Sequence, residues 1–303
     1  MATESRTLVI LALIANGVIA IVKFIAAAVS GSSAMLSEGF HSVADTGNQV
    51  FLLRGTAVSR YAADTRHPFG RGKELYFWSF MVAVFLFVGG AVIAFIEGLE
   101  RIRHPHADEG GLVFSLIVLA FAAIFEYFIA FGPALRQFNK VRSGRSLRST
   151  FREGKDPALL VVVFEDTAAL VGVMIAAAGL LLAHYTEWPQ WDGIASILIS
   201  ILLAGVAFFL AYEMKQLLVG ESATREDRSA IRAATLSVKE VSSIGRLLTM
   251  QLSANEILVN MDVHLDDGLS TDQVEVVIDK IEESIMEEVP EATRIFIELE
   301  PGL

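Results

Sequence analysis

The sequence predicts an α-helical membrane domain of six spans followed by a small α+β domain. Hydrophobic residues make up 53% of the 303 residues, charged residues make up 19%, and the mean hydropathy is +0.53. This composition is atypical of a soluble protein. Apolar runs of about 20 residues, enough helix to cross a hydrocarbon core of about 30 Å, recur until about residue 217. From Leu218 onward, 18 acidic and 7 basic side chains account for the whole net charge of -11.

Each apolar run is expected to form one membrane-spanning helix, so residues 1–217 are assigned to a transmembrane domain. The runs cover residues 7–30, 34–53, 76–96, 111–135, 158–183 and 192–212. Only Arg6 is basic ahead of the first run and no cleavage site is evident, which predicts a retained span rather than a signal peptide. The chain has no cysteine, so disulfides, thiolate metal sites and cysteine nucleophiles are excluded.

The charges of the loops predict the orientation, because cytoplasmic loops collect lysine and arginine. The second and fourth loops are the basic ones. Their cations are Arg54, Arg60, Arg66, Arg71 and Lys73 in the second, and Arg136, Lys140, Arg142, Arg145, Arg148, Arg152 and Lys155 in the fourth. Six spans then place both termini in the cytoplasm. The fourth loop could also bind acidic lipid headgroups, and no aromatic interleaving suggests nucleic acid.

Residues 218–303 are predicted to form a cytoplasmic α-β-β-α-β domain of ferredoxin-like type. Thr224 and Ser270 each begin a capping-box pattern ahead of a helix. Residues 246–253 and 256–267 alternate as a hairpin does around a tight Ala-Asn turn, and residues 294–300 read as a third strand. One face or edge of so small a sheet is expected to find a partner, which predicts a homodimer and a dimerisation or regulatory role.

Ionisable residues interrupt the second apolar run. Glu38, His41 and Asp45 stand at positions i, i+3 and i+7 and therefore share one face of a helix. His41 and Asp45 can bind one cation from a single turn. An imidazole nitrogen with a carboxylate oxygen suits Zn²⁺ and tolerates Fe²⁺, Mn²⁺ or Co²⁺.

Depth in the predicted spans suggests where further ligands lie. Asp45, Asp166, Glu126 and Asn16 all fall near the expected midplane, at about 1.5 Å of rise per residue. Ionisable groups at that depth are costly unless they are paired, hydrated or bound to a cation, so they are candidates for function.

Each further candidate also has a structural alternative. Glu38 could form a buried ion pair with Lys23, Glu126 could be a protonated acid bonded to a neighbouring helix, and Asn16 needs only an interhelical hydrogen bond. Glu165 lies beside Asp166 and is expected to point about 100° away from it, outside the same cavity. Asn48 and Gln49 could bond between helices.

Three segments, "HSVADTGNQ", "DTRHPFGRGKE" and "FEDTAALVG", together with six spans and an α-β-β-α-β domain, resemble the cation diffusion facilitators. The resemblance covers nearly the whole chain and is strongest to the Fe/Zn branch that includes the zinc transporter 9 type. It implies a homodimer that exports divalent metal from the cytoplasm in exchange for protons, by alternating access around His41, Asp45 and Asp166. Zn²⁺ is the expected substrate, with Fe²⁺ or Mn²⁺ as alternatives, no tightly bound cofactor is implied, and a bacterial inner membrane is the expected location.

The sequence departs from the family pattern at one expected ligand of the fifth span. Val162 stands four residues before Asp166, where the pattern has a ligand. Three protein ligands and a water, or a substitute such as Glu126, Asn16 or Glu165, could complete the site. An oxygen substitute would make the site less selective for zinc over iron or manganese.

The other metal sites of the family are reduced in this sequence. In the second loop Asp64 and His67 match, but Arg71 stands at the next family histidine. In the C-terminal domain the family's zinc cluster corresponds to residues that include no histidine: Gly245, Asp262, Glu298 and Glu300. These carboxylates could bind cations weakly or solvate an acidic face.

Other functional classes have different signatures. An intramembrane metalloprotease would need a pattern such as H-E-x-x-H, and a hydrolase would need a nucleophile with a positioned base; neither is evident. A non-transporting membrane partner or scaffold, and a passive divalent cation channel, remain as alternatives to a transporter.

Overall fold

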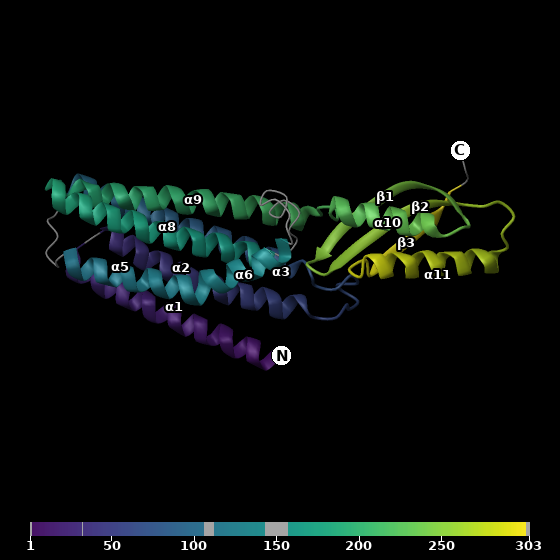
Figure 1. Ribbon diagram of the computed structural model, residues 1–303, viewed down its shortest axis with the longest axis horizontal. Coiled ribbons are helices and arrows are strands. Elements are labelled where there is room, and N and C mark those ends of the chain that lie inside the picture. Colours follow the sequence, from purple (N-terminus) through teal and green to yellow (C-terminus); the bar gives the residue numbers. More distant parts are fainter. Residues whose placement is uncertain (1, 32, 106–111, 143–156, 301–303) are drawn as a thin grey trace. The chain divides into compact units, whose positions relative to one another are not determined.

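The computed structural model describes residues 2–31, 33–105, 112–142 and 157–300 (Figure 1). It divides into two compact units, Met1–Ala57 with Phe77–Met214, and Val58–Tyr76 with Lys215–Leu303. Four of the fourth-loop cations used to predict orientation, Arg145, Arg148, Arg152 and Lys155, lie outside the described residues.

Six long helical segments run side by side in the described part of the first unit (Figure 1). Three of them, Glu74–Arg103, Leu159–Thr186 and Gln190–Val219, are long and apolar enough to cross a membrane, and the helical stretches Asn16–Val29 and Leu112–Glu126 are apolar but shorter. The segments are α1 (Ala2–Ser30), α2 (Ser33–Ser59), α3–η1–α4 (Glu74–Phe85, Leu86–Val92, Ile93–Arg103), α5–η2–α6 (Leu112–Glu126, Tyr127–Phe131, Gly132–Arg142), α8 (Pro157–Thr186) and α9 (Gln190–Val219).

Two of these segments contain a stretch of π-helix, which the sequence did not predict. The stretch η1 includes the adjacent glycines Gly89 and Gly90, and η2 begins directly after Glu126. A π turn changes the phase of the side chains that follow it and often occurs next to a functional group. The position of η2 therefore makes Glu126 a residue of interest.

The helix α1 has two faces of opposite character. Lys23 and Ala26 are buried, whereas Val18, Ile21 and Ile25 are more than half exposed. A row of large exposed apolar side chains is unfavourable in water and favourable against lipid. The α1 surface therefore fits a helix at the lipid-facing edge of a bundle.

The helices α4 and α9 pack closely through glycines. A Cβ on Gly98 would lie 2.8 Å from the carbonyl oxygen of Gly193, and a Cβ on Gly193 would lie equally close to that of Gly98. Ser196 of α9 donates a hydrogen bond of 2.9 Å to the carbonyl oxygen of Ala94, and its hydroxyl also contacts that of Ser37 on α2. Small residues thus let these backbones approach, as is typical of helices packed in membranes.

The second unit contains the predicted order α-β-β-α-β, formed by α10 (Arg225–Ser237), β1 (Val241–Ser253), β2 (Glu256–Leu265), α11 (Thr271–Glu288) and β3 (Arg294–Leu299). The strand order is β1-β2-β3, with β1 and β2 antiparallel and β2 and β3 parallel. Both predicted capping boxes are confirmed, at Thr224 and Ser270. Each N-cap contributes about 1 kcal/mol. Ile231 of α10 and Ile281 of α11 pack on Val259 of β2 in the core.

Residues 58–76 pack with this second unit. The ring of Phe69 lies 6.5 Å from that of Phe296 on β3, and Gly72 is so close to the backbone of Leu252 that a Cβ would overlap it. The sequence-based division after residue 217 placed this loop with the transmembrane domain. The difference arises because the division followed hydropathy, whereas packing depends on contacts between segments distant in sequence.

Candidate metal site between the helices

The predicted metal-binding face of α2 is buried. Glu38 and His41 are fully buried and Asp45 is 6% exposed. The Nδ1 atom of His41 lies 3.5 Å from Oδ1 of Asp45. Within the described residues, neither ring nitrogen of His41 nor Oδ1 of Asp45 has a hydrogen-bond partner. Buried polar atoms are normally satisfied. An imidazole without a hydrogen-bond partner, one turn from a carboxylate with one unpartnered oxygen, fits a divalent cation.

Glu165 of α8 faces this pair. Its carboxyl group shares a side-chain hydrogen bond with that of Asp45, and its Oε1 accepts a hydrogen bond of 3.0 Å from Nδ2 of Asn48. Two carboxyl groups share a hydrogen bond only when one of them holds a proton. Helical phase turns Glu165 about 100° away from Asp166, and the structure places its carboxyl group beside Asp45 and Asn48 of α2. The interhelical bond expected of Asn48 is confirmed.

Asp166 and Glu126 lie at the border of the same cluster. Asp166 is 7% exposed, its Oδ2 has no hydrogen-bond partner in the described residues, and it interacts electrostatically with Glu165 and Glu126. Glu126, the last residue of α5, is 8% exposed. The candidate carboxyl groups thus come from three helices, α2, α5 and α8.

The arrangement consists of pairs of side chains rather than a formed coordination sphere. In the described part of the chain, no three or more His, Asp or Glu side chains are arranged to hold a metal ion. The predicted set of His41, Asp45 and Asp166 therefore stays a prediction. Val162 is half-buried and packs beside Leu159 in an apolar cluster.

The buried ion pair expected of Glu38 is confirmed. Nζ of Lys23 on α1 donates to Oε2 of Glu38 at 3.0 Å, and both side chains are at most 1% exposed. Oε1 of Glu38 has no hydrogen-bond partner among the described residues and lies where a Cβ on Gly172 of α8 would meet it. Asn16, also on α1, is half-buried.

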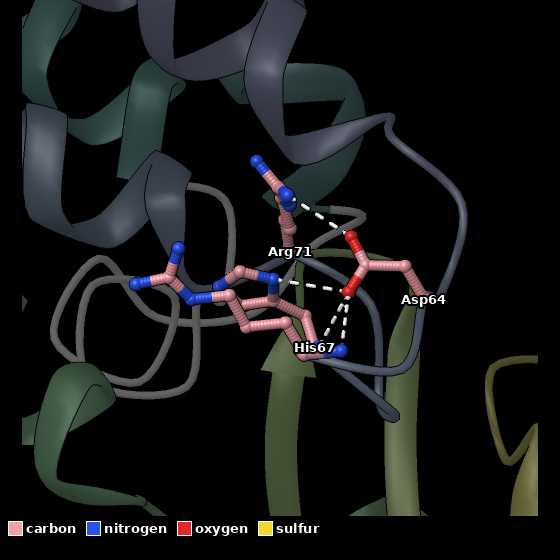
Figure 2. Close-up of polar contacts among 4 residues, drawn as sticks. Asp64, His67 and Arg71 are labelled. Carbon is pink, nitrogen blue, oxygen red and sulfur yellow. Dashed lines mark hydrogen bonds and ion pairs between the residues drawn. The ribbon is translucent and has the colours of Figure 1, made fainter.

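In the second loop, both carboxylate oxygens of Asp64 already have partners (Figure 2). Oδ1 accepts from the backbone N–H of His67 at 2.6 Å and lies 3.2 Å from Nδ1 of the same residue, and Oδ2 accepts from Nη2 of Arg71 at 3.0 Å. The hydrogen bond from Arg71, with that from the backbone of His67, lowers the pKa of Asp64 to about 2. An arginine therefore stands where a metal would neutralise this carboxylate.

The acidic cluster of the C-terminal unit also contains an arginine. Oδ2 of Asp262 accepts from Nε of Arg246 at 2.7 Å, and this bond lowers the pKa of the Asp262 carboxyl group. Nη2 of Arg246 lies 3.9 Å from Oε1 of Glu300, and Asp262 pairs with Glu298 in the β2–β3 register. Sequence reasoning missed Arg246, because its position depends on the irregular register of β1 between Ile244 and Leu247.

Comparisons with known proteins match both units. A family profile described as the cation efflux transmembrane domain matches residues 9–219, and one described as the cation efflux protein, cytoplasmic domain, matches residues 223–302. The chain is 30% identical over 268 residues to the mouse (Mus musculus) proton-coupled zinc antiporter SLC30A9, mitochondrial, which covers 87% of this chain and 46% of that protein. The chain thus spans about half the length of this relative.

Bacterial relatives are more distant in sequence but match along more of their length. The manganese efflux system protein MneP of Bacillus subtilis is 21% identical over 305 residues, 98% of this chain and 96% of that protein. The zinc transporter ZitB of Shigella flexneri is 26% identical over 284 residues, 93% of this chain and 83% of that protein.

Proposed function

The chain belongs to the cation efflux family of integral membrane proteins, and from this premise we propose that it exports divalent metal ions, Zn²⁺ first among them, in exchange for protons. The observation that carries the proposal is the buried group formed by His41, Asp45 and Glu165. Its ring nitrogens and one of its carboxylate oxygens have no hydrogen-bond partner in the described residues. Its two carboxyl groups lie within hydrogen-bond reach of each other, and we infer that they share a proton. The relatives named as zinc and manganese transporters support the same substrate class.

The shared proton supplies the coupling. A carboxylate binds metal only after it loses its proton, and imidazole binds metal in its neutral form. A divalent ion that enters between Asp45 and Glu165 therefore displaces the proton that they share, and a proton that returns favours release of the metal. If the site opens alternately to the two sides of the membrane, this exchange of metal for protons becomes antiport.

We further propose that Glu165 takes the place of the ligand that is missing at Val162. The resulting set has one imidazole, from His41, and carboxylates from Asp45 and Glu165, with Asp166 close by. Carboxylate oxygens suit Fe²⁺ and Mn²⁺ as well as Zn²⁺, so the site is expected to accept all three. Each protomer then holds one transported metal, because arginines already neutralise Asp64 and Asp262.

The proposed membrane arrangement follows the family and the loop charges. All six long helical segments cross the membrane, both termini face the cytoplasm, and the C-terminal domain joins two copies of the chain. The basic second and fourth loops support this orientation. We propose the inner membrane of a bacterium as the location.

Reconstitution in liposomes tests this function. Wild-type protein should move Zn²⁺ when a pH gradient is imposed, and Asp45→Asn should abolish the flux, while Asp262→Asn serves as a matched control that leaves the flux unchanged. A wild-type protein that moved no divalent ion under any gradient would act as a scaffold, and one whose flux ignored the pH gradient would be a channel. Either result would overturn the proposal.

A further inference from the structure

Lys23 is the only buried lysine or arginine among the described residues, and nothing in the proposed transport cycle uses it. Its side chain is 1% exposed and binds Oε2 of Glu38 at 3.0 Å. A buried ammonium is costly in a lipid-facing bundle, so such a group is more often functional than incidental.

The partner of Lys23 stands where a metal ligand could stand. Glu38 lies one turn before His41 and two turns before Asp45 on the same face of α2, so its carboxylate is in phase with both. One of its oxygens is nevertheless bonded to another helix. Oε2 binds Lys23 of α1, whereas Oε1 has no hydrogen-bond partner among the described residues and lies close to Gly172 of α8.

The charge of Lys23 also acts on the site itself. It attracts the carboxylates of Glu126 and Asp45, and it repels a positive charge on His41. A lysine ammonium is a compact charge on a flexible stem. Lys23 thus binds one potential ligand and offsets part of the negative charge of others.

We propose that Lys23 determines the metal selectivity of the transport site by withholding Glu38 from the ligand set. This inference rests on the proposed function. With Glu38 withheld, the ligand set has one imidazole and few carboxylates, and this set favours Zn²⁺. With Glu38 available, the additional oxygen favours harder ions such as Mn²⁺.

A double-mutant cycle on purified full-length protein tests this role, with Zn²⁺ and Mn²⁺ affinities measured by titration and transport of each ion measured in liposomes. Lys23→Gln keeps a hydrogen-bond donor but no charge. It should raise the affinity for Mn²⁺ relative to Zn²⁺ about tenfold, the lower end of what partners of metal ligands contribute. Glu38→Gln leaves the ammonium of Lys23 without a counter-charge and should lower the affinity for both ions by a similar factor. The double variant should return both affinities close to wild type.

Two outcomes would overturn the role of Lys23. If Lys23→Gln left the ratio of Mn²⁺ to Zn²⁺ affinity unchanged, the Lys23–Glu38 pair would be only a structural link between helices. If the double variant bound metal as weakly as Glu38→Gln, Glu38 would itself be a ligand. If Lys23→Gln fails to fold, the comparison of Glu38→Gln with the double variant still decides whether Glu38 is withheld from the metal or is a ligand. Wild-type protein that binds and moves no divalent ion would instead overturn the proposed function.

Discussion

The carboxyl groups buried between the transmembrane helices differ from those in the second unit in what neutralises their charge. Asp45 and Glu165 face each other from two helices and share a proton in the proposed cycle, whereas Asp64 and Asp262 each accept a hydrogen bond from an arginine of their own unit. An arginine satisfies a carboxylate permanently, because its guanidinium does not deprotonate in proteins. A shared proton, in contrast, can be replaced by a metal. The difference separates groups that exchange cations from groups that stabilise the fold.

The largest expected effect comes from the α2 pair. Asp45→Asn removes the anionic oxygen and the proton that it shares in the proposed cycle, so metal transport should be abolished. The expected fall is about a hundredfold or more, because loss of even an outer partner of a metal ligand costs up to about that much. Liposome flux of Zn²⁺ measures the loss. His41→Ala should match it, and retention of wild-type flux in either variant would place the site elsewhere.

A smaller loss is expected at Glu165. Glu165→Gln keeps the shape of the side chain and its contact with Asn48 but removes a carboxylate, so the affinity for Zn²⁺ should fall about tenfold. Fewer protons should also be released for each metal bound, as measured with a pH indicator during titration. Asp166→Asn is the matched comparison. If that variant lost more affinity and Glu165→Gln lost none, Asp166 would be the α8 ligand.

The C-terminal cluster should acquire metal binding when its arginine is removed. Arg246→Ala leaves Asp262, Glu298 and Glu300 without a counter-charge, so calorimetry should detect an additional weak site for divalent ions beside the single site of the wild type. The double variant Arg246→Ala with Asp262→Asn should lose that site again. A wild-type protein that bound a second metal in this unit would contradict the assigned role of the arginine.

The smallest effect is a pH dependence confined to strong acid. The folded-state pKa of Asp64 is about 2, below its ordinary value of 3.8, so its contribution to loop stability is complete above pH 3.8 and disappears as the pH falls towards 2. The carboxyl NMR signal of Asp64 should titrate near pH 2, and Arg71→Ala should move the midpoint towards 3.8. An unchanged midpoint in that variant would show that the backbone alone stabilises the charge.

Local patterns predicted most of the fold. The capping boxes at Thr224 and Ser270, the α-β-β-α-β order and the Lys23–Glu38 ion pair are all present in the structure. These features depend on residues close in sequence, or on a buried charge that has few candidate partners. They can therefore be inferred without coordinates.

The features that the sequence did not predict depend on distant contacts or on exact phase. The η2 stretch after Glu126 changes the helix phase, the irregular register of β1 places Arg246 beside Asp262, and the carboxyl group of Glu165 lies beside Asp45 of another helix. Helical periodicity assigns directions to side chains, but it does not include their length or the neighbouring helix. The positions that periodicity alone assigns to these charged groups therefore differ from their packed positions.

The most direct test of the account is a count of protons exchanged for metal in liposomes that contain a pH indicator. When Zn²⁺ is added to one side, wild-type protein should carry it across and move protons in the opposite direction, and an imposed pH gradient should drive Zn²⁺ against its own gradient. Asp45→Asn should do neither. Zn²⁺ flux without counter-movement of protons, or proton-coupled flux that survives in Asp45→Asn, would contradict the account.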